Sequence, residues 1–193
     1  RLELDRRSLL RGAVVVSTLA AGPGLAHAAM LPRRTIRFVV VDERIRESSA
    51  LGAALQLEGV QRLEVTAGLT KLWKDHLYPH WQGSQGDVVG LTTRSVWDGL
   101  SQQAHGQFRK ARIVGVHQLG STSEYYQHMI DAPLGAQIAI PDIAAGTSQW
   151  PQDLARMLAR SSSQPVRVRE PRLYGPGIPA DGLCQQLVSW IIE

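Results

Sequence analysis

Short runs of β-branched and apolar residues alternate with amphipathic segments along most of the chain. The first run, Ile36 to Val41, has the composition of a buried strand. A helix is expected from Ser48 to Leu57, because this segment is rich in Ala and Leu and Gly59 follows as a C-terminal stop. The same alternation then predicts strands over 62–66, 87–91 and 112–116, with helices over 70–78 and 94–104 between them.

Strand, helix and strand in succession are typical of parallel pairing, with each helix crossing over one face of the sheet. The C-terminal half is less regular: it predicts strands over 137–140 and 166–169, a helix from Pro151 to Arg160, and a last strand or helix end from Leu187 to Ile192. No composition break indicates a second domain. We therefore expect an α/β fold, a three-layer sandwich with a mostly parallel sheet of about five strands and a mixed or antiparallel C-terminal edge.

The N-terminal segment has the parts of a secretory signal. Basic residues precede an uncharged stretch from Gly12 to Pro32, and the small-residue sequence Ala26-His27-Ala28 lies near its end. Arg6 and Arg7, followed by two leucines and another arginine, resemble the twin-arginine (Tat) signal of bacteria. The sequence departs from the usual signal at the residue before the arginine pair, where Ser or Thr is commoner, and at the first leucine position of the motif, where Phe is commoner.

The resemblance implies export by the Tat translocase, cleavage after Ala28 and a single mature domain from Ala29 to Glu193 in the periplasm. Two alternatives remain open, an ordinary secretory signal and an uncleaved membrane anchor. The uncharged run of 21 residues is long enough to span a bilayer. Pro23 and its flanking glycines break a helix late in that run, so cleavage is favoured and no membrane attachment is expected afterwards.

Charge and cysteine content exclude several classes of function. The 193 residues include 21 Lys plus Arg and 17 Asp plus Glu, a formal charge of +4. Residues 1–28 hold four of the basic and two of the acidic residues, which leaves 17 against 15 in the mature part and argues against nucleic-acid binding. The single Cys184 excludes an intrachain disulfide and is expected to be a buried, inert thiol.

Polar residues follow the predicted strands at positions where a ligand could bind. In open parallel sheets, ligands bind beyond the carboxyl ends of the strands. Thr70 and Lys71 follow the second predicted strand, and Thr92, Thr93 and Arg94 follow the third. Threonine hydroxyls, an arginine and the free N–H groups of a helix N-terminus can together hold a carboxylate or phosphate. The alternative is that the threonines are plain helix caps and the arginine a solvated surface residue.

Two further residues at strand ends could act in catalysis. His117 is a candidate general base, oriented by Asp42 if the first and fourth strands lie close together. The structural alternatives are a satisfied buried histidine and an aspartate that caps the following turn. His76 and His80 have metal-ligand spacing, but Pro79 disturbs the helix between them, so no metal site is predicted. Nucleotide, hydrolase, iron–sulfur and haem motifs are absent, and no cofactor is assigned.

Two short segments, Gly90-Leu91-Thr92-Thr93 and Leu187 to Ile192, are similar to uncharacterised Tat-exported proteins of proteobacteria. This resemblance covers a small part of the mature chain and implies no activity for any residue. The sequence thus favours a periplasmic binding or accessory module that holds a small anion at the Thr-Thr-Arg turn or binds a co-exported protein. The alternative is a periplasmic enzyme with Asp42 and His117 as its acid–base pair.

Overall fold

The computed structural model describes residues 35–65, 68–83, 86–120, 126–133, 148–161, 169–174 and 184–193. All of them belong to a compact unit that runs from Arg33 to Glu193. The expected signal segment, residues 1–28, and the expected strand over 137–140 lie outside the described residues.

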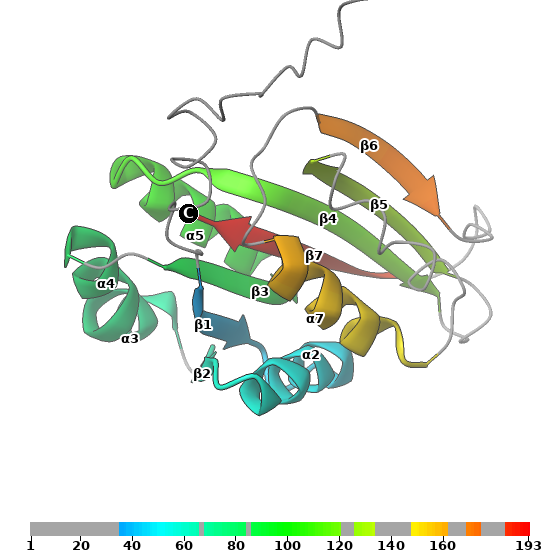
Figure 1. Ribbon diagram of the computed structural model, residues 1–193, viewed down its shortest axis with the longest axis horizontal. Coiled ribbons are helices and arrows are strands. Elements are labelled where there is room, and N and C mark those ends of the chain that lie inside the picture. The colour runs from blue at the N-terminus through cyan, green and yellow to red at the C-terminus, as the bar shows by residue number, and fades with distance from the viewer. Residues whose placement is uncertain are drawn as a thin grey trace, which may run out of the picture. The chain divides into compact units, whose positions relative to one another are not determined.

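Seven described strands form a single sheet in the order β2-β1-β3-β7-β4-β5-β6 (Figure 1). The strands are β1 (Ile36–Val41), β2 (Gln61–Glu64), β3 (Asp87–Thr93), β4 (Ala111–Gly120), β5 (Tyr126–Pro133), β6 (Arg169–Tyr174) and β7 (Cys184–Ile192). The helices are α2 (Arg46–Leu57), α3 (Leu69–Leu72), the π-helical turn η1 (Trp73–Leu77), α4 (Tyr78–Gly83), α5 (Arg94–Gly106) and α7 (Trp150–Ser161).

The sheet is mixed, so the α/β class is confirmed while the expectation of a mostly parallel sheet is wrong. Among the strands that the structure describes, parallel pairing is confined to β1, with β2 on one side and β3 on the other. Strand β7 lies antiparallel between β3 and β4, and β5 and β6 continue the antiparallel part. Strand β7 is mostly apolar from Leu187 to Ile192, and every residue of this run is buried. A strand of this composition is stable with strands on both edges and helices on both faces, which is the position that β7 occupies.

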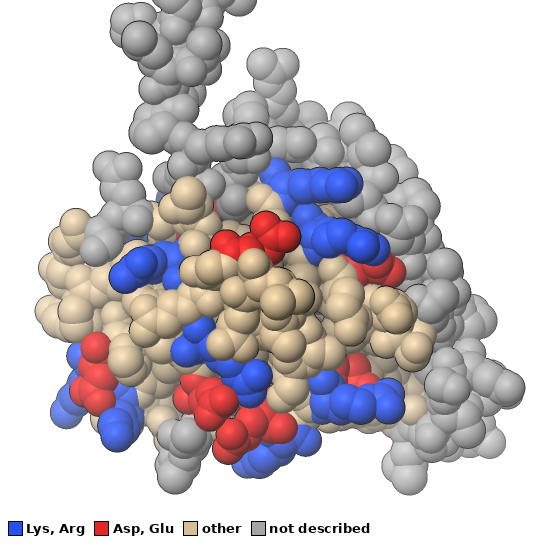
Figure 2. All heavy atoms as spheres, turned by 60° about the horizontal axis from the view of Figure 1, so that its bottom comes forward, with Lys and Arg blue, Asp and Glu red and all other residues tan. Residues whose placement is uncertain are grey.

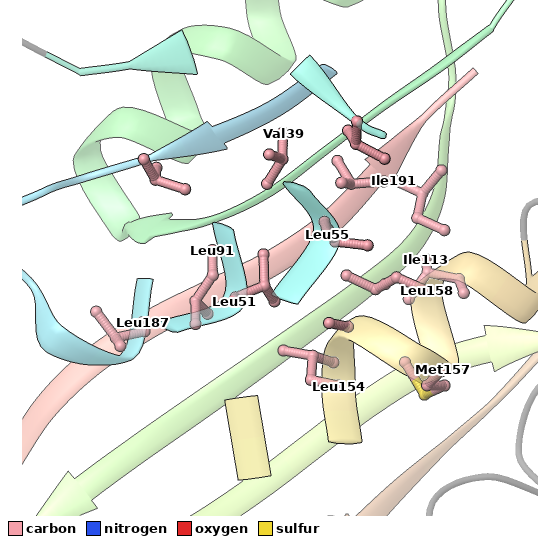
Figure 3. Close-up of a cluster of buried hydrophobic side chains, with 14 of the residues drawn as sticks. Val39, Leu51, Leu55, Leu91, Ile113, Leu154, Met157, Leu158, Leu187 and Ile191 are labelled. Carbon is pink, nitrogen blue, oxygen red and sulfur yellow. The ribbon is translucent and has the colours of Figure 1, made fainter. Parts of the chain in front are cut away.

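Alternate residues of the central strands enter two separate hydrophobic clusters. Val39 of β1 packs with Leu51 of α2 and Leu154 of α7 (Figure 3). Val41 of β1 belongs to the same cluster. The intervening residues, exemplified by Val40, pack on the opposite side with residues of α3, α4 and α5. This alternation is the two-residue period of a strand covered on both faces. Burial of both faces fixes the register of the sheet, since a slip of one residue would exchange the two clusters.

The helix expected over 70–78 continues past the proline that was expected to end it. Helical structure runs through α3, η1 and α4 to Gly83, with Pro79 at the second position of α4. The backbone N–H of Tyr78 donates to the carbonyl of Trp73, an i→i+5 bond of the π-helical turn. Leu77 and Trp81 are buried in the second cluster, and their burial keeps the segment helical on both sides of the proline.

Candidate functional site

The carboxyl ends of β1, β3 and β4 lie at the same edge of the sheet. Strand β4 is antiparallel to β7, which is antiparallel to β3, so β4 runs in the same direction as β3. Leu187 of β7 is paired with Thr93 on one side and with His117 on the other. Thr93 and His117, both expected near the carboxyl ends of strands, thus lie at one edge of the sheet, although β7 separates them.

A topological switch point lies between β1 and β3 at this edge. The chain leaves β1 through α2, which packs in the first cluster, and leaves β3 through α5, which packs in the second. Ser48 in the first turn of α2 fixes this arrangement, because its hydroxyl donates to the carbonyl of Leu91 and accepts from the N–H of Asp42. Crevices of this kind are where open α/β sheets bind ligands.

Asp42 is held by Arg44 and does not meet His117. The Nε and Nη2 atoms of Arg44 donate to the two carboxylate oxygens of Asp42 at 2.8 and 2.7 Å, and the backbone N–H of Arg44 adds a third bond at 3.2 Å. The hydrogen bond from Arg44 lowers the pKa of the Asp42 carboxyl. Strands β3 and β7 lie between β1 and β4, so three strand spacings, about 14 Å, separate the two strands. The expected acid–base pair does not form.

The predicted Thr-Thr-Arg turn divides into one buried and two accessible residues. Thr92 is fully buried and its Oγ1 accepts a hydrogen bond from Nε1 of Trp190 at 3.2 Å. Thr93 is the N-cap residue of α5 but makes no side-chain cap hydrogen bond; its hydroxyl lies 3.2 Å from that of Ser95. Arg94 is exposed and donates to Asp98 one helical turn later, at 2.9 Å. Thr93 and Arg94 are thus available to a ligand, whereas Thr92 serves the core.

Thr70 and Lys71 are exposed residues of α3, which follows β2 at the same edge. Thr70 is an internal residue of this short helix rather than its N-cap, which is Gly68. Because β2 is the outermost strand beside β1, these two residues lie at the periphery of the switch point.

A buried polar chain, which the sequence analysis missed, joins β5, β4 and β7. Nδ1 of His117 lies 2.8 Å from Nδ1 of His128, and Nε2 of His117 lies 2.7 Å from Oγ of Ser189. Both imidazoles pack on Trp150, with ring centroids 4.9 Å apart in each case. Gly115 makes room for this chain, because a Cβ atom there would lie 2.4 Å from Oγ of Ser189.

The two histidines are neutral at ordinary pH. Burial lowers the pKa of His117 well below its usual value, and the charge of His128 lowers it further. Burial lowers the pKa of His128 to about 4. The sequence offered one signal for this pair, since His117 lies at an inward position of a strand. It gave no indication of His128 or Ser189, because their proximity depends on the strand order.

Other sequence-based expectations concern single residues. His80 is buried, and its Nε2 contacts the carbonyl oxygen of Gly86 at 3.1 Å, while His76 is half-buried. No group of three or more metal-ligating side chains occurs within the described parts of the chain. Cys184 is exposed, so the expectation of a buried thiol is wrong: it is the first residue of β7, at the end opposite the buried Leu187–Ile192 run.

Basic and acidic side chains are interspersed on the face that Figure 2 presents, with no wide patch of one sign among the residues shown in colour. This distribution matches the near-balanced formal charge of residues 29–193, 17 basic against 15 acidic residues. Among the residues that the structure describes, no helix combines the length and the apolar character that crossing a membrane requires.

Comparison with known proteins adds no family assignment: no family model, no curated protein and no solved structure matches this chain.

Proposed function

We propose that the chain is an exported, periplasmic binding or accessory module that holds a small anion at the switch point between β1 and β3. The observation that carries the proposal is the convergence of two helix N-termini, those of α2 and α5, on the carboxyl ends of neighbouring parallel strands. Helix layers on both faces, as in a three-layer sandwich, give this crevice a rigid frame.

Both helices present N-terminal N–H groups that no N-cap side chain bonds. The N-cap residues are Ile45 for α2 and Thr93 for α5, and neither makes a side-chain cap hydrogen bond. The first-turn N–H groups and the positive end of each helix dipole favour a negatively charged ligand. Anion binding would supply the acceptors that a capping side chain provides elsewhere.

Accessible arginines flank the two helix termini. The side chain of Arg44 is 73% exposed although it is bonded to Asp42, and that of Arg94 is 57% exposed. In this proposal the anion accepts from the Thr93 hydroxyl and from Arg94, whose surface ion pair with Asp98 is weak enough to exchange. Lys71 and Thr70 stand at the rim and steer the anion toward the site. Buried Thr92 holds the strand end in position.

Isothermal titration calorimetry of the full-length mature protein with inorganic phosphate and with succinate tests this site. We expect Arg94→Gln and Thr93→Val each to weaken binding of the preferred anion by about tenfold, the loss of one charge-assisted hydrogen bond. Lys74→Gln, which removes an exposed charge from η1, is the matched control and should leave the affinity unchanged. Unchanged affinity in both site variants would remove the proposal.

Export and partner binding are tested on the protein as the cell makes it. We expect the double variant Arg6→Lys, Arg7→Lys to stay in the cytoplasm, while the parent chain is found in the periplasm with Ala29 as its first residue. Native mass spectrometry of the periplasmic protein should show a bound small anion or a stoichiometric partner. A bare monomer would count against the accessory role and favour an enzyme with a transient substrate.

The second candidate function is that of an enzyme. Its catalytic residues would be Ser189, His117 and His128 instead of the Asp42–His117 pair expected from the sequence. Ser189 would be the nucleophile, His117 the base and His128 the group that orients the base, an arrangement found in covalent catalysis. Ser189 Oγ would attack an ester carbonyl while its proton passes to His117 Nε2 and then to the leaving alkoxide; water would release the acid. Ser189 is fully buried, which ranks this candidate second. Labelling by a fluorophosphonate that Ser189→Ala abolishes would support it; no labelling would exclude it.

A further inference from the structure

A hollow lies along α5 and extends past its C-terminal end. Its volume is about 520 Å³, within the usual range for small-molecule sites. It is lined by α5 from Trp97 to His105, by the turn that follows and by the adjoining ends of β4 and β7. Helix α5 has 13 residues, so about 20 Å of helix separates its two ends. The basic residues of the lining lie at the C-terminal end of α5, away from the anion proposed at the switch point, whereas Trp97 lies one turn after Arg94.

The hollow combines an aromatic wall with an apolar floor. Trp97 lines it, and its ring is held by Trp190 with ring centroids 5.8 Å apart. Ala104 and Ile192 add buried apolar surface. A wall of this kind favours a flat aromatic ligand, which can stack on an indole that already has a fixed orientation.

Positive charge dominates the polar part of the lining. Arg109 and Lys110 contribute positive charges, against the single carboxylate side chain of Glu193, while Ser101 and His105 add polar groups. Arg109 is fixed by donating from Nη2 to the carbonyl of Trp81. The backbones of Lys110 and Glu193 hydrogen-bond to each other, at 3.3 and 3.0 Å, which holds this part of the rim in place. The charge balance favours an anionic group on the ligand.

Phe108, in the turn between His105 and Arg109, is a large aromatic residue at a position that favours glycine. Its φ is 56°, in the left-handed region, and 94% of its surface is exposed. The N–H of Phe108 donates to His105 and that of Arg109 to Ala104, so Phe108 occupies the position after a helix that glycine normally takes. The left-handed conformation completes this helix cap, whereas the exposed ring contributes nothing to the fold. An exposed phenyl ring next to the hollow therefore indicates a role in binding.

We propose that this hollow binds an aromatic carboxylate or a similar flat organic anion. The aromatic ring stacks on Trp97, the carboxylate pairs with Lys110 and with the remaining donors of Arg109, and Phe108 closes over the exposed side of the ring. Burial of Phe108 upon binding is the gain that offsets its strain in the free protein.

The test uses 1-naphthoate as the probe in calorimetric titrations of the full-length mature protein. We expect one molecule to bind per chain, about tenfold more tightly than uncharged 1-naphthalenemethanol. Lys110→Gln, a surface change, should weaken naphthoate binding about fivefold, and Lys74→Gln should not change it. Equal affinity for the two probes, or unchanged affinity in Lys110→Gln, would overturn the proposal.

Phe108→Gly gives a second readout that separates binding from folding. Glycine relieves the left-handed strain, so the variant should have a higher midpoint of thermal unfolding while binding naphthoate several-fold more weakly. A stabilised variant with unchanged affinity would show that Phe108 has no part in binding. Arg94→Gln should leave naphthoate binding intact, and excess phosphate should not displace the probe; either effect would show that the two sites are one.

Discussion

Nδ1 of His117 lies 2.8 Å from Nδ1 of His128, so these two nitrogens share one proton. One ring donates and the other accepts, because two N–H groups cannot face each other at hydrogen-bond distance. If His117 donates to His128, its Nε2 accepts the hydroxyl proton of Ser189; if it accepts, its Nε2–H donates to Ser189 Oγ. Either tautomer satisfies the three groups with both rings neutral, and burial disfavours a second proton on either ring.

Burial of His117 and His128 predicts that the protein loses stability in mild acid. Burial depresses the pKa of both histidines in the folded state, that of His128 to about 4, so between about pH 6.5 and pH 4 the unfolded chain binds more protons. The free energy of unfolding therefore falls as the pH is lowered through this window. His128 alone accounts for as much as roughly 3 kcal/mol by pH 4. Urea unfolding from pH 7.5 to pH 4 measures the effect.

Two variants test whether His128 is responsible for this pH dependence of the free energy of unfolding. His128→Asn removes one titrating group and should flatten the curve between pH 6.5 and pH 4. His76→Asn, which removes a half-buried histidine on η1 outside the His117–His128 pair, is the matched substitution for comparison. A curve for His128→Asn parallel to that of the parent chain would refute the assignment.

Gly115→Ala should disrupt the hydrogen bonds among His128, His117 and Ser189 by steric overlap. The new Cβ would lie 2.4 Å from Ser189 Oγ and 3.0 Å from His117 Nε2, and both groups are fixed by their hydrogen bond. We expect a loss of about 2 kcal/mol in the free energy of unfolding. Adding Ser189→Ala removes the nearest atom and should recover part of that loss in a double-mutant cycle.

The control for this substitution is Gly83→Ala, since a Cβ at Gly83 meets nothing within 4 Å. It should be neutral or slightly stabilising, because alanine restricts the unfolded chain more than glycine does. Equal losses for the two alanine variants would contradict the packing argument.

Local pattern was sufficient for the first three strands and their helices, but it could not predict the sheet order. The apolar run at Ile36–Val41 and the Ala- and Leu-rich helix after it form elements whose burial depends on neighbours close in sequence. Strand β7 pairs with β3 although about a hundred residues separate them in the sequence. Gly90 of β3 lies against the side chain of Trp190 of β7. A Cβ there would lie 2.3 Å from Trp190, a pairing that no local pattern contains.

The candidate site shows the same limit. Thr93 and His117 were predicted at one edge because both follow apolar strands, and that edge exists. Asp42 was matched with His117 because their chemistry suits each other, yet a guanidinium two residues away is a nearer partner for a carboxylate. The actual partners of His117, His128 and Ser189, come from strands that pair only through tertiary structure.

Arg44→Gln tests the ion pair with Asp42. Without the guanidinium, a buried carboxylate loses two of its hydrogen bonds, so the pKa of Asp42 should rise and the variant should be less stable at pH 7. Because the pair lowers the folded-state pKa, its contribution is present above the unfolded pKa near 4 and is lost at lower pH, below the histidine window. The difference in the free energy of unfolding between pH 7 and pH 3 should therefore be smaller in Arg44→Gln than in the parent chain. Arg46→Gln, at an exposed neighbour, is the control and should behave like the parent chain.

Thr92→Val and Thr93→Val form the last pair, in which adjacent residues should give opposite results. Thr92 is fully buried and accepts from Nε1 of Trp190, so valine leaves a buried N–H without its acceptor and should cost about 1 kcal/mol of stability. Thr93 has only a surface contact with Ser95, and its valine variant should be within about 0.5 kcal/mol of the parent.

Anion affinity should follow the reverse order. Thr93→Val removes a hydroxyl that the proposed anion contacts and should weaken binding, whereas Thr92→Val should leave the affinity of the folded protein unchanged. Thermal unfolding and calorimetric titration of the two variants, measured side by side, decide the matter. If Thr92→Val weakens anion binding as much as Thr93→Val does, the ligand reaches the core side of β3, and the site described at the head of α5 is misplaced.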